Sequence, residues 1–236
     1  MTMQLNPTKL GDKSYWDSVY EEERQNFDQF GDEGEIWFGQ ESVDKMVQWA
    51  IEHVPPGGDS GSRDGPFILD IGTGNGILCL SLVEEGYNPQ TIMGIDYSEA
   101  SVQLSEQIAK SREVEGLTFK VVDFVHGKTP NLHGQDGEAC WDLLLDKGTY
   151  DAMALSADPG SGQEHPTSLY PSRVTALLKP GGFFLITSCN FTEQEIENYF
   201  TSKEPSLKYH SRVRHPTYTF GGKSGSICST IAFRKE

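Results

Sequence analysis

Apolar residues in the N-terminal part of the chain recur at helical spacing. Within residues 41–54 they fall at intervals of three and four positions and Pro55-Pro56 follows, which predicts an amphipathic helix that ends at the prolines. Residues 12–30 have a similar pattern and predict another helix. We therefore expect residues 1–54 to form an N-terminal helical lid segment. The polar, turn-forming residues 55–66 predict a flexible loop.

From Phe67 onward the pattern changes, because short apolar runs alternate with segments of helical periodicity. This alternation predicts an α/β fold, a parallel sheet with helices on its faces. The predicted strands are 67–71, 91–95, 117–122, 142–146 and 182–187, and the predicted helices are 76–86, 98–112 and 167–178. Two further strands, 206–216 and 226–234, are expected to form a hairpin, and 134–139 and 157–166 are expected to be loops. Residues 67–236 are predicted to form the main domain of a single-domain chain.

The composition narrows the function classes. The chain has 236 residues and a formal net charge of −16, which opposes direct binding to nucleic acid and suits a cationic partner, although such a charge also serves solubility. We find no apolar run long enough to span a bilayer and no signal or transit peptide, so we expect a cytoplasmic protein without membrane contact, with the nucleus also open. The four cysteines lack metal-ligand spacing, so no metal is expected. We favour a monomer.

A glycine-rich turn follows the first predicted strand. Residues 67–80 read FILDIGTGNGILCL, in which the strand runs into Gly72-x-Gly74-x-Gly76 and then into a helix. Backbone without side chains at the carboxyl edge of a parallel sheet lets a ligand come close. A dinucleotide fingerprint would need glycine where Ile77 stands, and no phosphate-binding loop motif is present. The turn therefore favours a ligand of another kind.

Aspartates close several of the predicted strands. Asp96 stands where a carboxylate can accept both hydroxyls of a ribose, and Asp123 could accept a hydrogen bond from an adenine amine. Asp70 precedes the glycines and could face an ammonium group. A ligand with a ribose, an adenine and a cationic amino-acid end, but no phosphate, is S-adenosylmethionine. For each aspartate alone, a helix cap or a strand-end turn is the alternative.

These motifs carry a family resemblance. LDIGTGNG, GIDYS and VVDF resemble the seven-strand, class I methyltransferases, and GDEGEIWFG, LDKGTYDA, GGFFLITSCN and YTFGGKSG resemble the protein-lysine N-methyltransferases that modify translation elongation factor 1-alpha. The resemblance implies a three-layer Rossmann-like fold with strand order 3-2-1-4-5-7-6 and strand 7 antiparallel. It implies S-adenosylmethionine as cofactor and elongation factor 1-alpha as protein substrate. The implied cofactor-binding residues are Trp37, Asp70, Gly72, Thr73, Gly74, Asn75, Gly76, Asp96, Tyr97, Asp123, Phe124 and Asp146.

The segment DKGTY after the fourth predicted strand carries the expected acceptor chemistry. Methyltransferases of amino groups place acceptor-facing residues there, so we expect Asp146 to orient the incoming amine and pass its proton to water. Tyr150 is expected to supply an aromatic wall, with core packing as its alternative. Trp37 and Phe38 either fold over the cofactor or pack in the core.

The acceptor is less well determined than the cofactor. The acidic residues Asp32, Glu33 and Glu35 either stand at the mouth of the site and attract a basic protein or are solvated surface charges. Methyltransferases that act on adenine in nucleic acids usually carry an Asn/Asp-Pro-Pro-aromatic motif, and DKGTYD has no proline. A small-molecule or nucleic-acid methyltransferase, or a cofactor-binding module that has lost transfer, stay open as alternatives.

Overall fold

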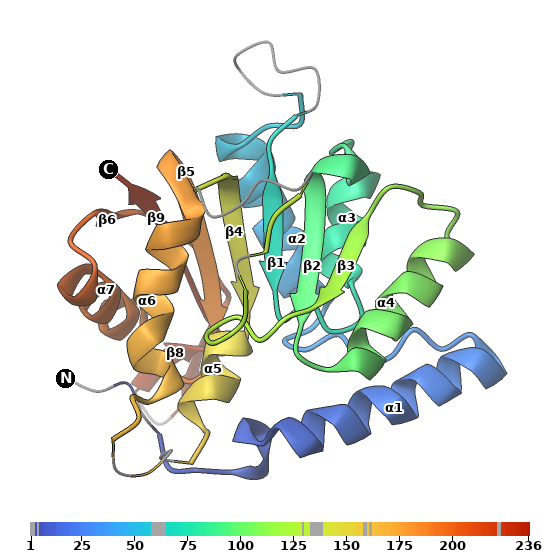
Figure 1. Ribbon diagram of the computed structural model, residues 1–236. Helices are drawn as coiled ribbons and strands as arrows, with labels where there is room; N and C mark the ends of the chain where they lie inside the picture. The colour runs from blue at the N-terminus through green and yellow to red at the C-terminus, as the bar shows by residue number, and fades with distance from the viewer. Residues whose placement is uncertain are drawn as a thin grey trace.

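The computed structural model describes residues 3, 5–57, 65–128, 130–132, 139–157, 160, 162–220 and 223–236, with the backbone alone for 217–220 and 223–226. Its centre is a seven-stranded sheet with helices on both faces (Figure 1). The strands of this sheet are β1 (Ile68–Ile71), β2 (Ile92–Asp96), β3 (Thr118–Val121), β4 (Trp141–Lys147), β5 (Leu178–Ser188), β6 (Leu207–Val213) and β9 (Ser229–Lys235). The segment between β6 and β9 contributes a separate hairpin of β7 (Thr217–Phe220) and β8 (Lys223–Ser226).

The strand order is β3-β2-β1-β4-β5-β9-β6, and β9 pairs antiparallel with both β5 and β6. Since β9 is the seventh strand of the sheet along the chain, this order confirms the predicted 3-2-1-4-5-7-6 arrangement with strand 7 antiparallel. The first five strands pair in parallel. Their carboxyl ends therefore meet at one edge of the sheet, where open α/β folds bind ligands.

The central strands are buried on both faces, which explains their unbroken apolar runs. In β1, Leu69 and Ile71 belong to one hydrophobic core, while Ile68 belongs to the core on the opposite face. In β4, Leu144 faces the first core, and its neighbours Leu143 and Leu145 face the second. This alternation has the period of two that a strand requires.

Seven α-helices are found among the described residues. They are α1 (Lys13–Phe30), α2 (Gln40–His53), α3 (Ile77–Glu84), α4 (Glu99–Ser111), α5 (Thr149–Ala154), α6 (Pro166–Leu177) and α7 (Glu193–Lys203), with short 3-10 helices at Lys9–Gly11 and Pro89–Thr91. Helices α5, α6 and α7 contribute buried residues to the first core, and α2, α3 and α4 contribute to the second. Helix α1 runs along the carboxyl edge of the sheet, below the arrowheads of β1 to β3 in Figure 1.

The predicted elements were found, but helices α5 and α7, the hairpin of β7 and β8 and the start of β5 were missed. Helix α5 is a six-residue element, too short to show a periodicity. Helix α7 has a capping box between Thr192 and Glu195, a signal that the sequence carried but that was not used. Strand β5 begins at Leu178 and not at residue 182 as predicted, because Leu178 already pairs with Trp141 of β4.

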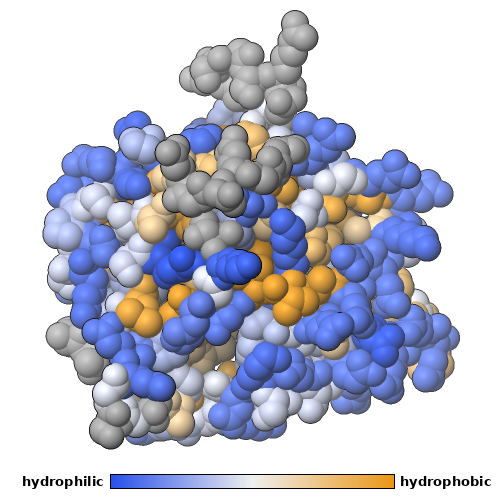
Figure 2. All heavy atoms as spheres, viewed as in Figure 1, coloured by the Kyte–Doolittle hydropathy of each residue, from blue (hydrophilic) through white to orange (hydrophobic). Residues whose placement is uncertain are grey.

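Most of the predicted loop at 55–66 and of the predicted insertion at 134–139 lies outside the described residues. The proposed lid segment divides into two parts, because Val43 and Met46 of α2 are fully buried in the second core whereas α1 covers the carboxyl edge. In the view of Figure 2 hydrophilic residues cover most of the surface, and apolar residues gather near the centre. Among the described residues, no helix has the length and apolar character that a membrane crossing requires.

Candidate active site

The glycine turn after β1 brings three elements within contact distance. Gly72 and Gly74 have φ angles of +69° and +59°, a conformation that favours glycine. A Cβ on Gly72 would lie 1.9 Å from the Thr149 Oγ1 atom, and one on Gly74 would lie 2.7 Å from the Tyr20 hydroxyl. The turn therefore requires glycine both for its backbone conformation and because α5 and α1 approach it closely.

Asp96 at the end of β2 fixes this turn. Its carboxylate accepts hydrogen bonds from the Gly74 N–H (3.1 Å) and the Ser98 N–H (2.9 Å). The Ser101 and Ser105 hydroxyls of α4 hold the Gly74 carbonyl at 2.7 and 2.8 Å. Burial raises the pKa of Asp96 to about 6. An ionised carboxylate offers about four acceptor positions, so Asp96 has capacity left for a ligand.

Two adjoining cavities lie at this edge of the sheet, with volumes of ≈ 150 and ≈ 230 Å³. Their shared lining residues are Gly72, Asp96, Tyr97, Thr149 and Ala152, so we treat the two cavities as one groove. Asp123 and Phe124 line the larger cavity, and the Asp123 carboxylate accepts from the backbone N–H groups of Val125 and His126. Asp96, Tyr97, Asp123 and Phe124 thus lie together along the groove.

Aromatic side chains form a wall of the smaller cavity. Trp16 and Tyr20 come from α1, and Trp37 and Phe38 come from the segment that joins α1 to α2. The rings of Trp16 and Trp37 meet edge to face at 4.8 Å between centroids. The Lys147 ammonium group, at the end of β4, donates to the Trp37 carbonyl at 3.0 Å and holds this segment in place. Trp37 and Phe38 therefore line the groove.

Phe38 is one of two described non-glycine residues with a positive φ, at +65°. An aromatic residue in this region of backbone space costs about 1–3 kcal/mol and is found where surrounding structure enforces it. Gly148 lies opposite, and a Cβ there would come within 2.9 Å of the Phe38 ring. The strained Phe38 and the bare Gly148 together bring the joining segment against the end of β4.

The first residues of the chain form a strap over α5, which we define as residues 5–12. The Leu5 N–H donates to the Ala154 carbonyl at 2.9 Å, and the Thr8 N–H donates to the Leu155 carbonyl at 3.0 Å. The Leu10 carbonyl accepts from the Trp16 indole N–H at 2.7 Å, and Leu10 lines the smaller cavity. The strap therefore closes one side of the groove. It belongs to the segment 1–54 that was expected to form a lid, but no pattern in the sequence had singled out residues 5–12.

Two of the predicted cofactor-binding residues at the turn, Asp70 and Gly76, lie outside the lining of both cavities. Asp70 is buried beneath the turn, where it accepts from the Thr73 hydroxyl at 2.8 Å, and it does not line either cavity. Gly76 also lies away from the cavities and packs against Phe119 and Ser105. Thr73 and Asn75 do line the smaller cavity. Asp70 thus supports the turn from below through Thr73.

Asp146 and Tyr150, the predicted catalytic pair, lie outside the lining of both cavities. The Asp146 carboxylate is fully buried, accepts from the N–H groups of Thr149 (2.8 Å) and Tyr150 (3.0 Å), and also accepts from the Tyr170 hydroxyl. It therefore caps the N-terminus of α5, and burial raises its pKa to about 7. The Tyr150 ring packs in the core beside Tyr170, at 5.2 Å between centroids, so its alternative of core packing holds.

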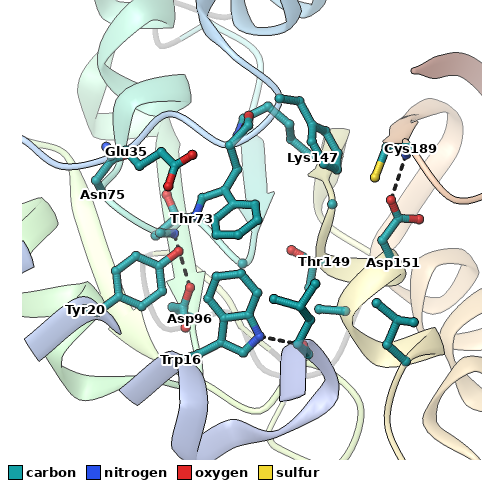
Figure 3. A pocket seen from close by; sticks show the side chains of 18 of the residues that line it. Trp16, Tyr20, Glu35, Thr73, Asn75, Asp96, Lys147, Thr149, Asp151 and Cys189 are labelled. Atoms are coloured by element: carbon teal, nitrogen blue, oxygen red, sulfur yellow. Dashed lines mark hydrogen bonds between the residues drawn. The ribbon is translucent and has the colours of Figure 1, made fainter. Parts of the chain in front are cut away.

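Asp151 is the carboxylate of this segment that reaches the groove (Figure 3). It accepts from the Ser188 hydroxyl at 2.5 Å and from the Cys189 N–H at 2.7 Å, both at the end of β5. Burial raises its pKa above the ordinary value. In Figure 3, Asp151 and Cys189 lie across the cavity from Thr73 and Asp96. The groove therefore has a carboxylate on each side.

The sequence did contain a signal for Asp151. Residues Gly148, Thr149, Ala152 and Leu155 line the smaller cavity together with Asp151, and they share one face of a helix that begins after Gly148. Tyr150 points to the opposite side. Recognition of α5 would therefore have assigned Tyr150 to the core and Asp151 to the groove.

The acidic segment between α1 and α2 is partly paired. Glu33 forms an ion pair with Arg112 of α4, and Asp32 accepts from the Gly34 N–H at 3.1 Å. Glu35 lines the smaller cavity, so one of the three acidic residues lies at the groove. No group of histidine, cysteine or acidic side chains able to hold a metal is found among the described residues.

Comparisons of the sequence with known proteins identify its family. Residues 62–226 match the family model described as a methyltransferase domain. The chain is 42% identical to the protein-lysine N-methyltransferase efm4 of Schizosaccharomyces pombe, over 98% of this chain and 95% of that protein. It is 37% identical to the human EEF1A lysine methyltransferase 2, over 97% of this chain and 88% of that protein.

Solved structures share the fold at low sequence identity. The N-methyltransferase NodS from Bradyrhizobium japonicum, in complex with S-adenosyl-L-homocysteine, aligns with a TM-score of 0.59 at 13% identity and covers 93% of this chain and 98% of its own. The magnesium protoporphyrin IX methyltransferase from Synechocystis, with bound S-adenosylmethionine, aligns with a TM-score of 0.57 at 16% identity and covers 92% and 97%. These two likenesses concern the fold.

Proposed function

Because this chain belongs to the methyltransferase-domain family and, within it, to the protein-lysine N-methyltransferases, we propose that it methylates the ε-amino group of a lysine in translation elongation factor 1-alpha. The observation that carries this proposal is the groove that runs from Asp123 past Asp96 to Asp151. It combines a binding site for an elongated ligand with a buried carboxylate at its far end. The substrate is proposed from the names of the relatives, which cover almost the whole chain.

The residues of the groove fit S-adenosylmethionine. Asp96 has acceptor capacity for a ribose, and Asp123 and Phe124 line a cavity suited to an adenine. The glycine turn leaves space that a Cβ would fill, and two buried carboxylates, Asp96 and Asp151, favour a cationic ligand. When bound, this cofactor supplies a methyl group on a positively charged sulfur.

The aromatic wall has two tasks in this proposal. Trp16, Tyr20 and Trp37 exclude water from the smaller cavity, and their ring faces attract a cation. Exclusion of water strengthens electrostatic interactions inside the site. The walls of the cavity also hold the reacting groups in alignment. The Lys147 ammonium group donates to the Trp37 carbonyl and so keeps the joining segment, with its aromatic side chains, against the cavity.

Asp151 is the group that we assign to the acceptor amine. A lysine amine has an ordinary pKa of about 10.4 and is protonated at neutral pH, so it must lose a proton before it can attack. The Asp151 carboxylate is held by Ser188 and Cys189, and burial makes it a stronger base than an ordinary aspartate. It accepts a hydrogen bond from the amine, orients the nitrogen lone pair and passes the proton to water at the mouth of the groove.

The proposal is tested by methyl transfer from labelled S-adenosylmethionine to purified elongation factor 1-alpha. Lysine-to-arginine variants of that substrate, total RNA and free lysine serve as competing acceptors. We expect label on the folded protein and its loss in one lysine-to-arginine variant. Label mainly on RNA or on free lysine, or equal labelling of every variant, would contradict the proposal. A cytoplasmic location stays a prediction from the sequence.

A further inference from the structure

A second cavity opens beside the acceptor end of the groove. It has a volume of ≈ 670 Å³, larger than either part of the groove, and lies between the start of α7, strand β6 and the residues before β9. We call it the side groove and define it by Cys189, Asn190, Phe191, Glu193, Glu197, Tyr209, Arg212 and Ile227. None of the cofactor-binding residues named above belongs to it.

The side groove is continuous with the active site. Cys189 and Asn190 line both the side groove and the smaller cavity that contains Asp151. The N–H of Cys189 is also the group that holds the Asp151 carboxylate. A chain whose lysine reaches Asp151 therefore has its neighbouring residues at the entrance of the side groove, because successive residues of an extended chain are about 3.3 Å apart.

Its surface combines apolar and acidic groups. Ile227 is 68% exposed and Tyr209 is 41% exposed, two of the four large apolar side chains that are exposed among the described residues. Among the described residues of the side groove, Arg212 is the one cationic side chain, and it is paired with Glu193 at 3.0 Å. Glu197 has no ion pair among the described residues. The described part of the side groove therefore offers an apolar contact together with one net negative charge.

We propose that the side groove binds the segment of the protein substrate that adjoins the acceptor lysine, with an apolar side chain on Ile227 and Tyr209 and a basic side chain facing Glu197. This proposal rests on the proposed function and adds to it how the substrate is selected. Contacts remote from the reacting amine position it and are reflected in the affinity for the substrate. The complementary charge of a basic segment adds specificity and a faster encounter.

Two variants test the proposal in the full-length protein. Ile227→Ser removes the exposed apolar side chain, and Glu197→Lys reverses the charge. Each should raise KM for folded elongation factor 1-alpha about tenfold, while kcat at saturating substrate stays within about twofold of the wild type. The dissociation constant for S-adenosylmethionine, measured by calorimetry, should stay unchanged, because the side groove lies outside the cofactor residues.

Matched controls separate this effect from a general change of the surface. Phe30→Ser removes an apolar side chain that is 77% exposed at the end of α1, and Glu106→Lys reverses an exposed charge on α4. Both controls should leave KM unchanged. Unchanged KM in Ile227→Ser and Glu197→Lys, or equal increases in the controls, would overturn the docking proposal.

The outcomes also distinguish this proposal from the function on which it depends. If the wild type does not methylate the elongation factor at all, the proposed function fails. If the wild type is active and the two variants are equally active at low substrate concentration, only the docking proposal fails. Sedimentation velocity tests whether a second copy of this chain occupies the side groove. A wild type that is a dimer and an Ile227→Ser variant that is a monomer would assign the side groove to that second copy and overturn the proposal.

Discussion

The two halves of the carboxyl edge use aspartates differently. After β2, the strand-end Asp96 lines the groove and fixes the glycine turn through backbone N–H groups. After β4, the strand-end Asp146 is buried away from the groove, and Asp151, five positions later, takes the place beside the cavity. Both strands are parallel and both aspartates are buried, so neither strand direction nor burial explains the difference.

The difference lies in the N–H groups that each carboxylate engages. Both aspartates stand three residues before the first residue of the next helix. The Asp96 carboxylate accepts from the Ser98 N–H and from the Gly74 N–H in the turn of the neighbouring strand, so it stays at the groove. The Asp146 carboxylate accepts from the N–H groups of Thr149 and Tyr150 and therefore caps α5. A strand-end carboxylate thus lines a ligand site only when the first N–H groups of the following helix do not engage it.

The largest effect is expected from the acceptor half. Asp151→Asn should lower kcat about 100-fold, because the amide cannot accept the proton of the acceptor amine. Stability should change little, since an amide oxygen still accepts from Ser188 or Cys189. Steady-state methyl transfer and thermal unfolding measure the two quantities. Asp44→Asn, an exposed position on α2, is the control and should match the wild type. An active Asp151→Asn enzyme would remove Asp151 from the proposed chemistry.

The cofactor half is tested by Asp96→Ala. Removal of this buried acceptor should weaken S-adenosylmethionine binding by about 1–3 kcal/mol. Asp123→Ala should weaken S-adenosylmethionine binding by less than about 1 kcal/mol. The Asp123 side chain is 53% exposed, so water competes with the ligand for its carboxylate oxygens. Calorimetry gives both values. Equal losses in the two variants would place the dominant polar contact at the larger cavity and not at the glycine turn.

The contact between the two halves is tested at Gly72, which lies against Thr149 of α5. Gly72→Ala should lower the free energy of unfolding by about 1–2 kcal/mol more than Gly86→Ala does. Both glycines have positive φ angles, but a Cβ on Gly86 would meet no atom within 4 Å. The pair therefore separates backbone strain from overlap with Thr149. If chemical denaturation shows the same loss of stability in Gly72→Ala and Gly86→Ala, then α5 moves away from the added Cβ at no cost in free energy.

The smallest effect is expected in the pH dependence of stability. Burial raises the pKa of Asp146 to about 7, well above the ordinary aspartate value of about 3.9. Between these two values the folded protein therefore holds a proton that the unfolded chain releases. Stability from this group is therefore present at low pH and is lost as pH rises. Relative to Asp146→Asn, the wild type should lose about 1 kcal/mol between pH ~5 and ~6. A constant difference in urea unfolding would show that the pKa of Asp146 is not raised.

The sequence predicted the fold more completely than the site. Most helices and strands followed from apolar runs, which are local patterns, whereas the strand order was implied by the family resemblance. Asp96, Tyr97, Asp123 and Phe124, four of the predicted cofactor-binding residues, line the groove, because each stands within three residues of the end of β2 or β3. The wall formed by Leu10, Trp16 and Tyr20 was not predicted. Helical periodicity indicates which face of a helix is buried, but it does not indicate which part of the protein that face packs against.

The acceptor half escaped prediction for another reason. Helix α5 is only six residues long and was not predicted, so Asp146 was assigned from its place after the fourth strand, where methyltransferases of amino groups have acceptor-facing residues. The contacts of Asp151 with Ser188 and Cys189 join residues of α5 to the end of β5. Such contacts depend on the pairing of β4 with β5, which a local pattern does not encode.

The strap has a consequence for the order in which the protein is made. Leu5 and Thr8 leave the ribosome well before Ala154 and Leu155, whose carbonyl groups accept their N–H hydrogen bonds. Closing so long a loop carries an entropic cost, and domains fold as units from the N-terminal side during synthesis. The strap must therefore wait undocked until α5 has been translated. A nascent chain that ends before α5 holds the whole glycine turn and still has no closed groove.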